Sequence, residues 1–155
     1  MTVNPIRVIF ICTGNYCRSP MAEAVFNQLV ERAGLSANFM VDSAATTHWE
    51  VGKRPHPGTQ AVLAKHGVPL RPEKRARQVS PAELPRYDYV IAMDDTNLSD
   101  LRPFRGARLL LEFGPAGTPL NVPDPYYMHD FDATFNLVNE ACAGLLKRIR
   151  EEKGV

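Results

Sequence analysis

The sequence predicts an α/β fold in which a twisted, parallel sheet of four strands carries helices on both faces, in one domain that spans residues 1–155. Short apolar runs alternate with amphipathic segments, and a chain of 155 residues is long enough to bury a single core. The runs predicted as strands are residues 8–11, 39–41, 87–93 and 108–111. Strands separated by helices pair in parallel through right-handed crossovers, so a ligand crevice is expected beyond their carboxyl ends.

The helices are predicted from apolar residues at helical spacing. The first covers residues 20–33, with Ser19 as its N-cap, Pro20 as its first residue and Gly34 at its end. Later helices are expected at residues 58–66, with residues 61–63 facing inward, at residues 94–101, and after the cap Asp130, where the apolar face is Phe131, Phe135, Val138, Cys142, Leu145 and Ile149. Cys142 is therefore expected in the core.

The composition is that of an ordinary soluble globular protein, with 45% hydrophobic and 23% charged residues. A formal net charge of +1 gives no reason to expect nucleic acid or an anionic membrane as a partner. An odd number of cysteines, three, indicates a reducing compartment, for which we expect the cytoplasm. The apolar run near the N-terminus is too short for a signal peptide, and no run approaches the length of a membrane span.

The stretch from Cys12 to Ser19 joins the first predicted strand to the first predicted helix. Gly14 and Asn15 lie inside it, and these residue types most readily adopt positive φ. A loop curled at a helix N-terminus directs several backbone N–H groups at one point, where the helix dipole adds positive character. The sequence therefore predicts an anion-binding loop that begins with Cys12 and ends with Arg18.

The residues of this loop indicate attack of sulfur on phosphorus. The amides and Arg18 favour the thiolate form of Cys12, and the planar guanidinium of Arg18 matches two phosphate oxygens. Asn15 is expected to hold the curled loop, and Ser19 to donate a hydrogen bond to the Cys12 sulfur. Cys17 either packs beneath the loop or lies close enough to Cys12 to form a disulfide on oxidation. A buried cysteine beside a surface arginine is the alternative, but the flanking strand and helix start favour the anion site.

A general acid is sought because the leaving oxygen needs a proton. Asp124 is the candidate, since it lies in an irregular loop and Pro125 fixes its backbone as extended. Tyr126 and Tyr127 suit the rim of a pocket for an aromatic group, although an Asp-Pro turn with surface tyrosines would have the same sequence. Trp49 is either a wall of this pocket or a lid on the core.

Other polar residues have weaker assignments. Ser43, with Asp42, either hydrogen-bonds to the Cys12 loop or only ends its strand. His66 precedes Gly67 at a helix end, where a capping or packing role is favoured over catalysis. The basic group of residues 71–77 is expected to be a solvated surface.

These motifs together resemble the low-molecular-weight protein tyrosine phosphatases over nearly the whole chain. The matching segments are residues 12–23, Asp42-Ser43-Ala44, Trp49 with Gly52 and Pro55, His66-Gly67, Ala76-Arg77-Gln78, residues 93–98 and Asp124-Pro125. The resemblance implies hydrolysis of phosphotyrosine proteins through a phosphocysteine, with no metal or other cofactor and with phosphate or vanadate as inhibitors.

The resemblance also implies roles for individual residues. Cys12 would attack, Arg18 and the loop would hold the phosphate, and Asp124 would protonate the phenol and then activate water. Ser43 and His66 would brace Asn15. The substrate and phosphate contacts would come from Thr13, Gly14, Asn15, Tyr16, Cys17, Ser19, Trp49, Tyr126 and Tyr127.

The chain departs from the family pattern at three positions. Thr13 and Tyr16 stand where many members have aliphatic residues, and Ala45 replaces a common glycine. Protein arginine phosphatases of the same fold remain the alternative, although they have threonine in place of Tyr16 and lack the paired tyrosines after Asp-Pro. Thioredoxin-coupled arsenate reductases need further cysteines, and a phosphoprotein-binding module without catalysis would have no use for Asp124.

Overall fold

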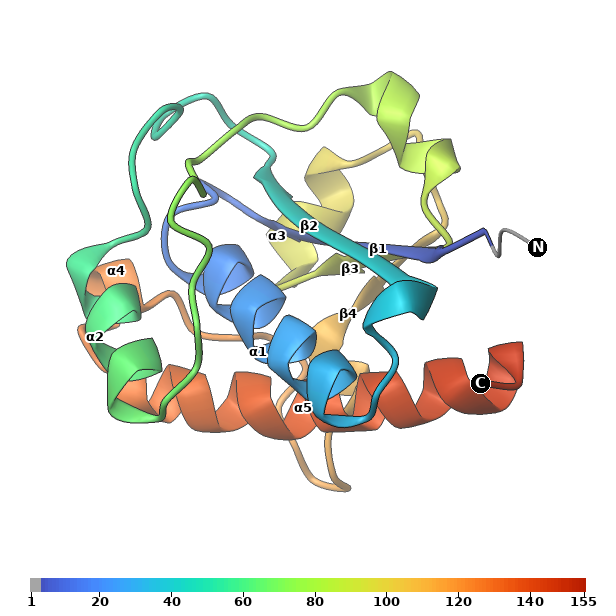
Figure 1. The fold of residues 1–155 in the computed structure, drawn as a ribbon. Helices are drawn as coiled ribbons and strands as arrows, with labels where there is room; N and C mark the ends of the chain where they lie inside the picture. The colour runs from blue at the N-terminus through green and yellow to red at the C-terminus, as the bar shows by residue number, and fades with distance from the viewer. Residues whose placement is uncertain (1–3) are drawn as a thin grey trace.

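The computed structural model describes residues 4–155 and confirms the α/β fold with a four-stranded parallel sheet (Figure 1). The strands are β1 (Ile6–Cys12), β2 (Phe39–Ala45), β3 (Tyr89–Ala92) and β4 (Ala107–Leu109), in the spatial order β2-β1-β3-β4. The chain moves from β1 to the β2 edge and then crosses back to β3, so the order reverses beside β1. A crevice is expected at this reversal, beyond the carboxyl ends of β1 and β3.

Helices cover both faces of the sheet, as predicted. They are α1 (Arg18–Arg32), α2 (Pro57–Lys65), α3 (Asp95–Asp100), α4 (Pro125–Met128) and α5 (Phe131–Lys153), with short 3-10 turns at Ser36–Asn38, Pro81–Arg86 and Leu110–Phe113. Figure 1 shows the long α5 lying alongside α1, and these two helices pack against each other and the sheet. Part of the second face is covered by the segments that flank β3.

Alternate residues of β1 enter two separate cores. Val8 and Phe10 pack with α1 and α5, whereas Ile9 and Ile11 pack with Leu84 and neighbouring residues on the opposite face. A central strand buried on both faces needs apolar side chains at successive positions, which explains its unbroken apolar run. Cys142 is fully buried in the first core, as expected.

The start of α1 differs from the prediction. The helix begins at Arg18, and Cys17 is its N-cap without a side-chain hydrogen bond to the helix. Ser19 is not the cap because its hydroxyl is engaged by Cys12 and Asn15. The loop is therefore two residues shorter than expected, which brings Arg18 onto the first turn of the helix.

Other boundaries also shift. β2 extends to Ala45, β3 and β4 are shorter than predicted, and Ala61 of α2 is exposed although it was expected to face inward. Gly34 and Gly67 follow α1 and α2 with φ of 72° and 67°, the left-handed conformation expected at these helix ends. Within residues 4–155, no helix combines the length and apolar character needed to cross a membrane.

Candidate active site

The loop between β1 and α1 is held in shape by the Asn15 side chain. Asn15 has φ of 52° and is 1% exposed. Its Nδ2 donates to Ser19 Oγ at 2.8 Å and to Ser43 Oγ at 2.9 Å, and its Oδ1 accepts from the Arg77 amide at 3.1 Å. All its hydrogen-bonding groups are used, so the predicted role of Asn15 as the fixed point of the loop is supported by its contacts.

Gly14 has a different function from the one its residue type suggested. It does not have positive φ; only Asn15 does within the loop. A Cβ at Gly14 would lie 3.1 Å from Glu50 Cγ, which is tighter than ordinary van der Waals contact. Gly14 therefore allows the segment that carries Glu50 to approach the loop.

The Cys12 sulfur lies at the centre of this arrangement. It is 3.0 Å from Ser19 Oγ and accepts from the Asn15 amide at 3.2 Å. Because Asn15 Nδ2 already donates to Ser19 Oγ, the Ser19 hydrogen is left to point at sulfur. The sulfur is therefore the acceptor of two hydrogen bonds, one from the loop backbone and one from a side chain of α1.

Arg18 is 2% exposed and is fixed by groups from distant parts of the chain. Its Nη1 donates to Asp94 Oδ2 at 2.7 Å and to the Val122 carbonyl at 3.0 Å. Burial alone would lower the pKa of Arg18, but the negative charge at Cys12, the hydrogen bond to Asp94 and the charge of Asp124 outweigh burial and raise the pKa above its usual value. Since Nη1 is engaged, the edge formed by Nε and Nη2 is the one left for an anion.

Thr13 and Asn97 complete a polar ring around Arg18. Thr13 Oγ1 accepts from Asn97 Nδ2 at 3.1 Å and from Arg18 Nη2 at 3.4 Å. Asn97 is fully buried and forms a capping box with Asp94 at the start of α3. Our sequence reasoning missed Asp94 and Asn97 as site residues, although Asp94 follows β3, whose carboxyl end lies beside that of β1.

Most of the predicted site residues line one cavity of about 180 Å³. Asn15 and Ser19, which were predicted to contact the phosphate, are buried and do not belong to its lining, and neither do Ser43 and His66. Cys12 and Arg18 are almost fully buried, whereas Trp49 is 64% and Tyr127 69% exposed, so the sulfur lies at the bottom and the aromatic side chains form the rim. Trp49 is thus a pocket wall and not a lid on the core. The full lining is Cys12, Thr13, Gly14, Tyr16, Cys17, Arg18, Trp49, Glu50, Asp124, Tyr126 and Tyr127.

Asp124 reaches this cavity from the start of α4. Its backbone is extended, with φ of −81° and ψ of 111°, as expected for a residue before proline. Oδ1 accepts from the Tyr126 amide at 3.0 Å, and Oδ2 lies 3.5 Å from Arg18 Nη2. One carboxylate oxygen therefore anchors the side chain while the other is available to a ligand above Cys12.

Tyr16 is an aromatic wall supported by its neighbours. Its ring lies 5.0 Å from that of His56 and 6.4 Å from that of Tyr126, measured between centroids. Lys53 Nζ lies 5.6 Å from the centre of the Tyr16 ring and also pairs with Glu50, a second carboxylate of the cavity. Sequence reasoning missed Glu50 because nothing in the local pattern marks it.

Cys17 lines the same cavity as Cys12 but has a different electrostatic environment. Burial, with the negative charges of Asp124 and Cys12, raises the pKa of the Cys17 thiol well above its usual value. Cys17 is therefore a neutral thiol in the lining of the cavity. Burial also raises the pKa of Cys142, which lies in the core away from the loop.

The proposed brace of Asn15 by His66 is wrong. His66 is exposed at the end of α2, and its ring stacks on Phe135 with centroids 4.0 Å apart. Ser43 does contact Asn15, and the Arg77 amide takes the place assigned to His66. Helix-end packing, which the residues alone favoured for His66, is what the structure contains.

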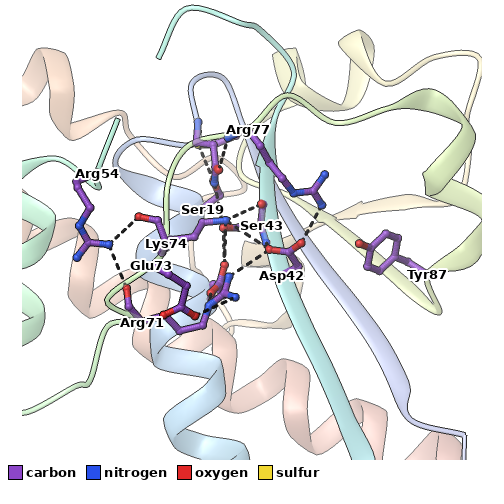
Figure 2. Close-up of polar contacts among 12 residues, drawn as sticks. Ser19, Asp42, Ser43, Arg54, Arg71, Glu73, Lys74, Arg77 and Tyr87 are labelled. Carbon is purple, nitrogen blue, oxygen red and sulfur yellow. Dashed lines mark hydrogen bonds and ion pairs between the residues drawn. The ribbon is translucent and has the colours of Figure 1, made fainter. Parts of the chain in front are cut away.

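The basic group at residues 71–77 is not simply a solvated surface. Lys74 is buried, and Arg71 and Arg77 point inward to the carboxylates of Asp42 and its neighbours (Figure 2). Burial of Asp42 would raise its pKa, but Lys74, the Ser43 amide and Arg77 together lower it below its usual value. Arg75 alone of this group is exposed without a carboxylate partner among the residues described here.

The fold and the site define the class of cysteine-dependent phosphoric monoester hydrolases. Residues 7–155 match the family described as low molecular weight phosphotyrosine protein phosphatase. The chain belongs to this family.

Relatives match nearly the whole chain. It is 40% identical over 154 residues to the low molecular weight protein-tyrosine-phosphatase YfkJ of Bacillus subtilis, covering 96% of this chain and 98% of that protein. The crystal structure of YfkJ superposes with a TM-score of 0.93 at 38% identity, over 99% of both chains. A Drosophila arginine phosphatase also has this fold, with a TM-score of 0.82 and 31% identity over 94% of this chain and 98% of that one.

Proposed function

We propose that this protein hydrolyses phosphotyrosine in proteins through a phosphocysteine intermediate. The observation that carries the proposal is the Cys12 sulfur, which accepts hydrogen bonds from the Asn15 amide and Ser19 within a loop closed by Arg18. Asp124 lines the same cavity, where its Oδ2 lies 3.5 Å from Arg18 Nη2.

In the first step, the Cys12 thiolate attacks phosphorus opposite the phenolic oxygen. Arg18 and the loop amides bind the non-bridging oxygens and stabilise the charge that spreads over them in the transition state. The sulfur–phosphorus bond forms as the bond from phosphorus to the phenolic oxygen breaks. Asp124 gives its proton to that oxygen, so tyrosine leaves as a neutral phenol.

In the second step, water attacks the phosphorus of the phosphocysteine. Asp124, now a carboxylate, takes a proton from this water, and the sulfur–phosphorus bond breaks to return the thiolate. The hydrogen bonds from Ser19 and the Asn15 amide make sulfur a better leaving group at this point. Inorganic phosphate is the product, and phosphate and vanadate are expected to inhibit by occupying the loop. No step draws on a metal ion or an organic cofactor.

The cavity walls favour an aryl phosphate. Tyr16, Trp49, Tyr126 and Tyr127 surround the entrance, and aromatic rings pack well on the flat ring of phosphotyrosine. Phosphoarginine is the alternative substrate, since a Drosophila arginine phosphatase shares the fold. The bulky Tyr16 ring, supported by His56 and Tyr126, speaks for the aromatic substrate instead.

The test compares Asp124→Asn with wild type on aryl phosphates of graded leaving-group acidity. Asparagine keeps an oxygen for the Tyr126 amide but has no proton to give, so kcat for phenyl phosphate should fall by about two to four orders of magnitude. The loss should shrink for a nitrophenol that departs as an anion. Asp130→Asn is the matched control, because Asp130 also caps a helix but lies outside the cavity.

Two further measurements complete the test. Cys12→Ser should abolish turnover while vanadate still binds, because the remaining loop amides and Arg18 are unchanged. Peptides with phosphotyrosine, phosphoserine and phosphoarginine, compared by kcat/KM, should rank phosphotyrosine first. Equal losses of Asp124→Asn on all leaving groups would assign the acid elsewhere, and a preference for phosphoarginine would replace the proposed substrate.

A further inference from the structure

A buried ion pair lies behind the phosphate-binding loop, where the proposed reaction does not use it. The side chains of Lys74 and Glu23 are 4% and 2% exposed, and Lys74 Nζ lies 3.3 Å from Glu23 Oε1. Removing two charges from water is costly unless each finds several partners. Figure 2 shows Lys74 among Ser43, Asp42 and Arg71.

The Lys74 ammonium group lies among three oxygen atoms, one from a backbone carbonyl and two from carboxylates. Nζ donates to the Ser43 carbonyl at 2.8 Å, and it lies 3.4 Å from Asp42 Oδ1 in addition to its contact with Glu23. Two hydrogen bonds and one ion pair therefore fix the position of this compact cation.

Glu23 is surrounded by donors only. Oε1 accepts from Ser43 Oγ at 2.7 Å and Oε2 accepts from Arg71 Nε at 2.8 Å, while Lys74 Nζ approaches from a third side. The single hydrogen of the Ser43 hydroxyl is therefore given to Glu23 Oε1.

The direction of that hydrogen bond determines the next ones. With its hydrogen given to Glu23, Ser43 Oγ has only lone pairs for Asn15 Nδ2, which lies 2.9 Å away. The other Nδ2 hydrogen goes to Ser19, whose own hydrogen is left for Cys12. The buried ion pair and the nucleophile are therefore the two ends of one chain of hydrogen bonds.

We propose that Lys74 and Glu23 are positioning residues for the nucleophile loop. Lys74 holds the Glu23 carboxylate in the place where it accepts the Ser43 hydrogen. Ser43 Oγ is then the acceptor for Asn15, and Asn15 is held with its amide on the Cys12 sulfur. Arg71 does not replace Lys74 in this role, because it is 42% exposed and contacts the other carboxylate oxygen. This inference rests on the proposed function, since it concerns the reactivity of Cys12.

The experiment is a double-mutant cycle between Lys74→Met and Ser43→Ala, measured as kcat on an aryl phosphate. Lys74→Met alone should lower kcat about tenfold, within the span of couplings inside one hydrogen-bonded network. If Lys74 acts through Ser43, Lys74→Met should cause little further loss in the Ser43→Ala background. The losses would multiply if Lys74 acted only by its charge or by general destabilisation.

The matched control is Arg75→Met, which removes the same charge from the next residue. Arg75 is exposed and its side chain donates to the Gly52 carbonyl, away from Glu23 and Ser43, so this variant should keep kcat within twofold of wild type. Urea unfolding of each variant separates lost stability from lost positioning. Where Lys74→Met does not fold, Lys74→Gln enters the same cycle, because it removes the charge but keeps a polar side chain.

The outcomes separate this inference from the proposed function. A wild-type protein without aryl phosphatase activity would overturn the proposed function itself. An active wild type with multiplicative losses in the cycle, or with equal losses for Lys74→Met and Arg75→Met, would overturn the positioning role alone. A loss confined to Lys74→Met and absent in the Ser43→Ala background would support it.

Discussion

Asn15→Ala should be among the most damaging single changes to the loop, and the loss it causes in the free energy of unfolding can be worked out from the structure. The substitution removes two buried hydrogen bonds, to Ser19 and Ser43, and a partly buried one from the Arg77 amide, each contributing about 1 kcal/mol to the free energy of unfolding. Alanine at φ of 52° adds about 1–2 kcal/mol of backbone strain. The expected loss is therefore about 4–5 kcal/mol.

Asn15→Gly separates the two contributions. Glycine accepts positive φ but also loses the hydrogen bonds and gains freedom in the unfolded chain, so it should be about 1 kcal/mol more stable than Asn15→Ala. Urea unfolding measures both variants, and both should lose most of their aryl phosphatase activity. Full activity in Asn15→Gly would refute the reasoning, because it would show that the loop keeps its shape without the side chain.

Three further changes test the redox, acid and packing behaviour. After brief peroxide treatment and reduction, wild type should recover activity and Cys17→Ser much less, because a disulfide to Cys17 protects the nucleophile; equal recovery would leave Cys17 as packing. The pKa of Asp42 is lowered by Lys74 and its neighbours despite burial, so its stabilisation is present above about pH 4 and lost as pH falls through the lowered pKa. Asp42→Asn should make the free energy of unfolding depend less on pH in this acid range, and an unchanged pH dependence would exclude this role of Asp42. Gly144→Ala should cost about 2–3 kcal/mol in urea unfolding, since its Cβ would lie 1.8 Å from the Phe113 carbonyl oxygen, whereas a neutral result would mean that α5 shifts freely.

The nucleophile loop could be predicted because its chemistry is local. Cys12, Asn15 and Arg18 lie within seven consecutive residues, and the strand before them and the helix after them fix their relative positions. The prediction of where α1 starts was wrong for a physical reason. Ser19 has the side chain of a good N-cap, but its hydroxyl is hydrogen-bonded to the buried Cys12 sulfur and the buried Asn15 amide instead of the helix backbone.

The groups behind the loop could not be predicted, because each comes from a distant part of the chain. Lys74 and Glu23 are 51 positions apart, and a lysine between Glu73 and Arg75 has the local sequence of a solvated surface. Only the tertiary structure shows that Lys74 turns inward while Arg75 stays outside. His66 was assigned to Asn15 by resemblance alone, and no contact supports that assignment.

The structure also distinguishes two aspartates that sequence reasoning could not compare. Asp94 and Asp124 both cap helices with one carboxylate oxygen, and both direct the other oxygen at Arg18. Asp94 Oδ2 lies 2.7 Å from Arg18 Nη1, and Asp94 does not line the cavity, so one of its oxygens caps α3 while the other holds the guanidinium. Asp124 Oδ2 lies 3.5 Å from Arg18 Nη2, and Asp124 lines the cavity. A proton can be exchanged with substrate only from the looser contact, which is why Asp124, and not Asp94, suits the acid.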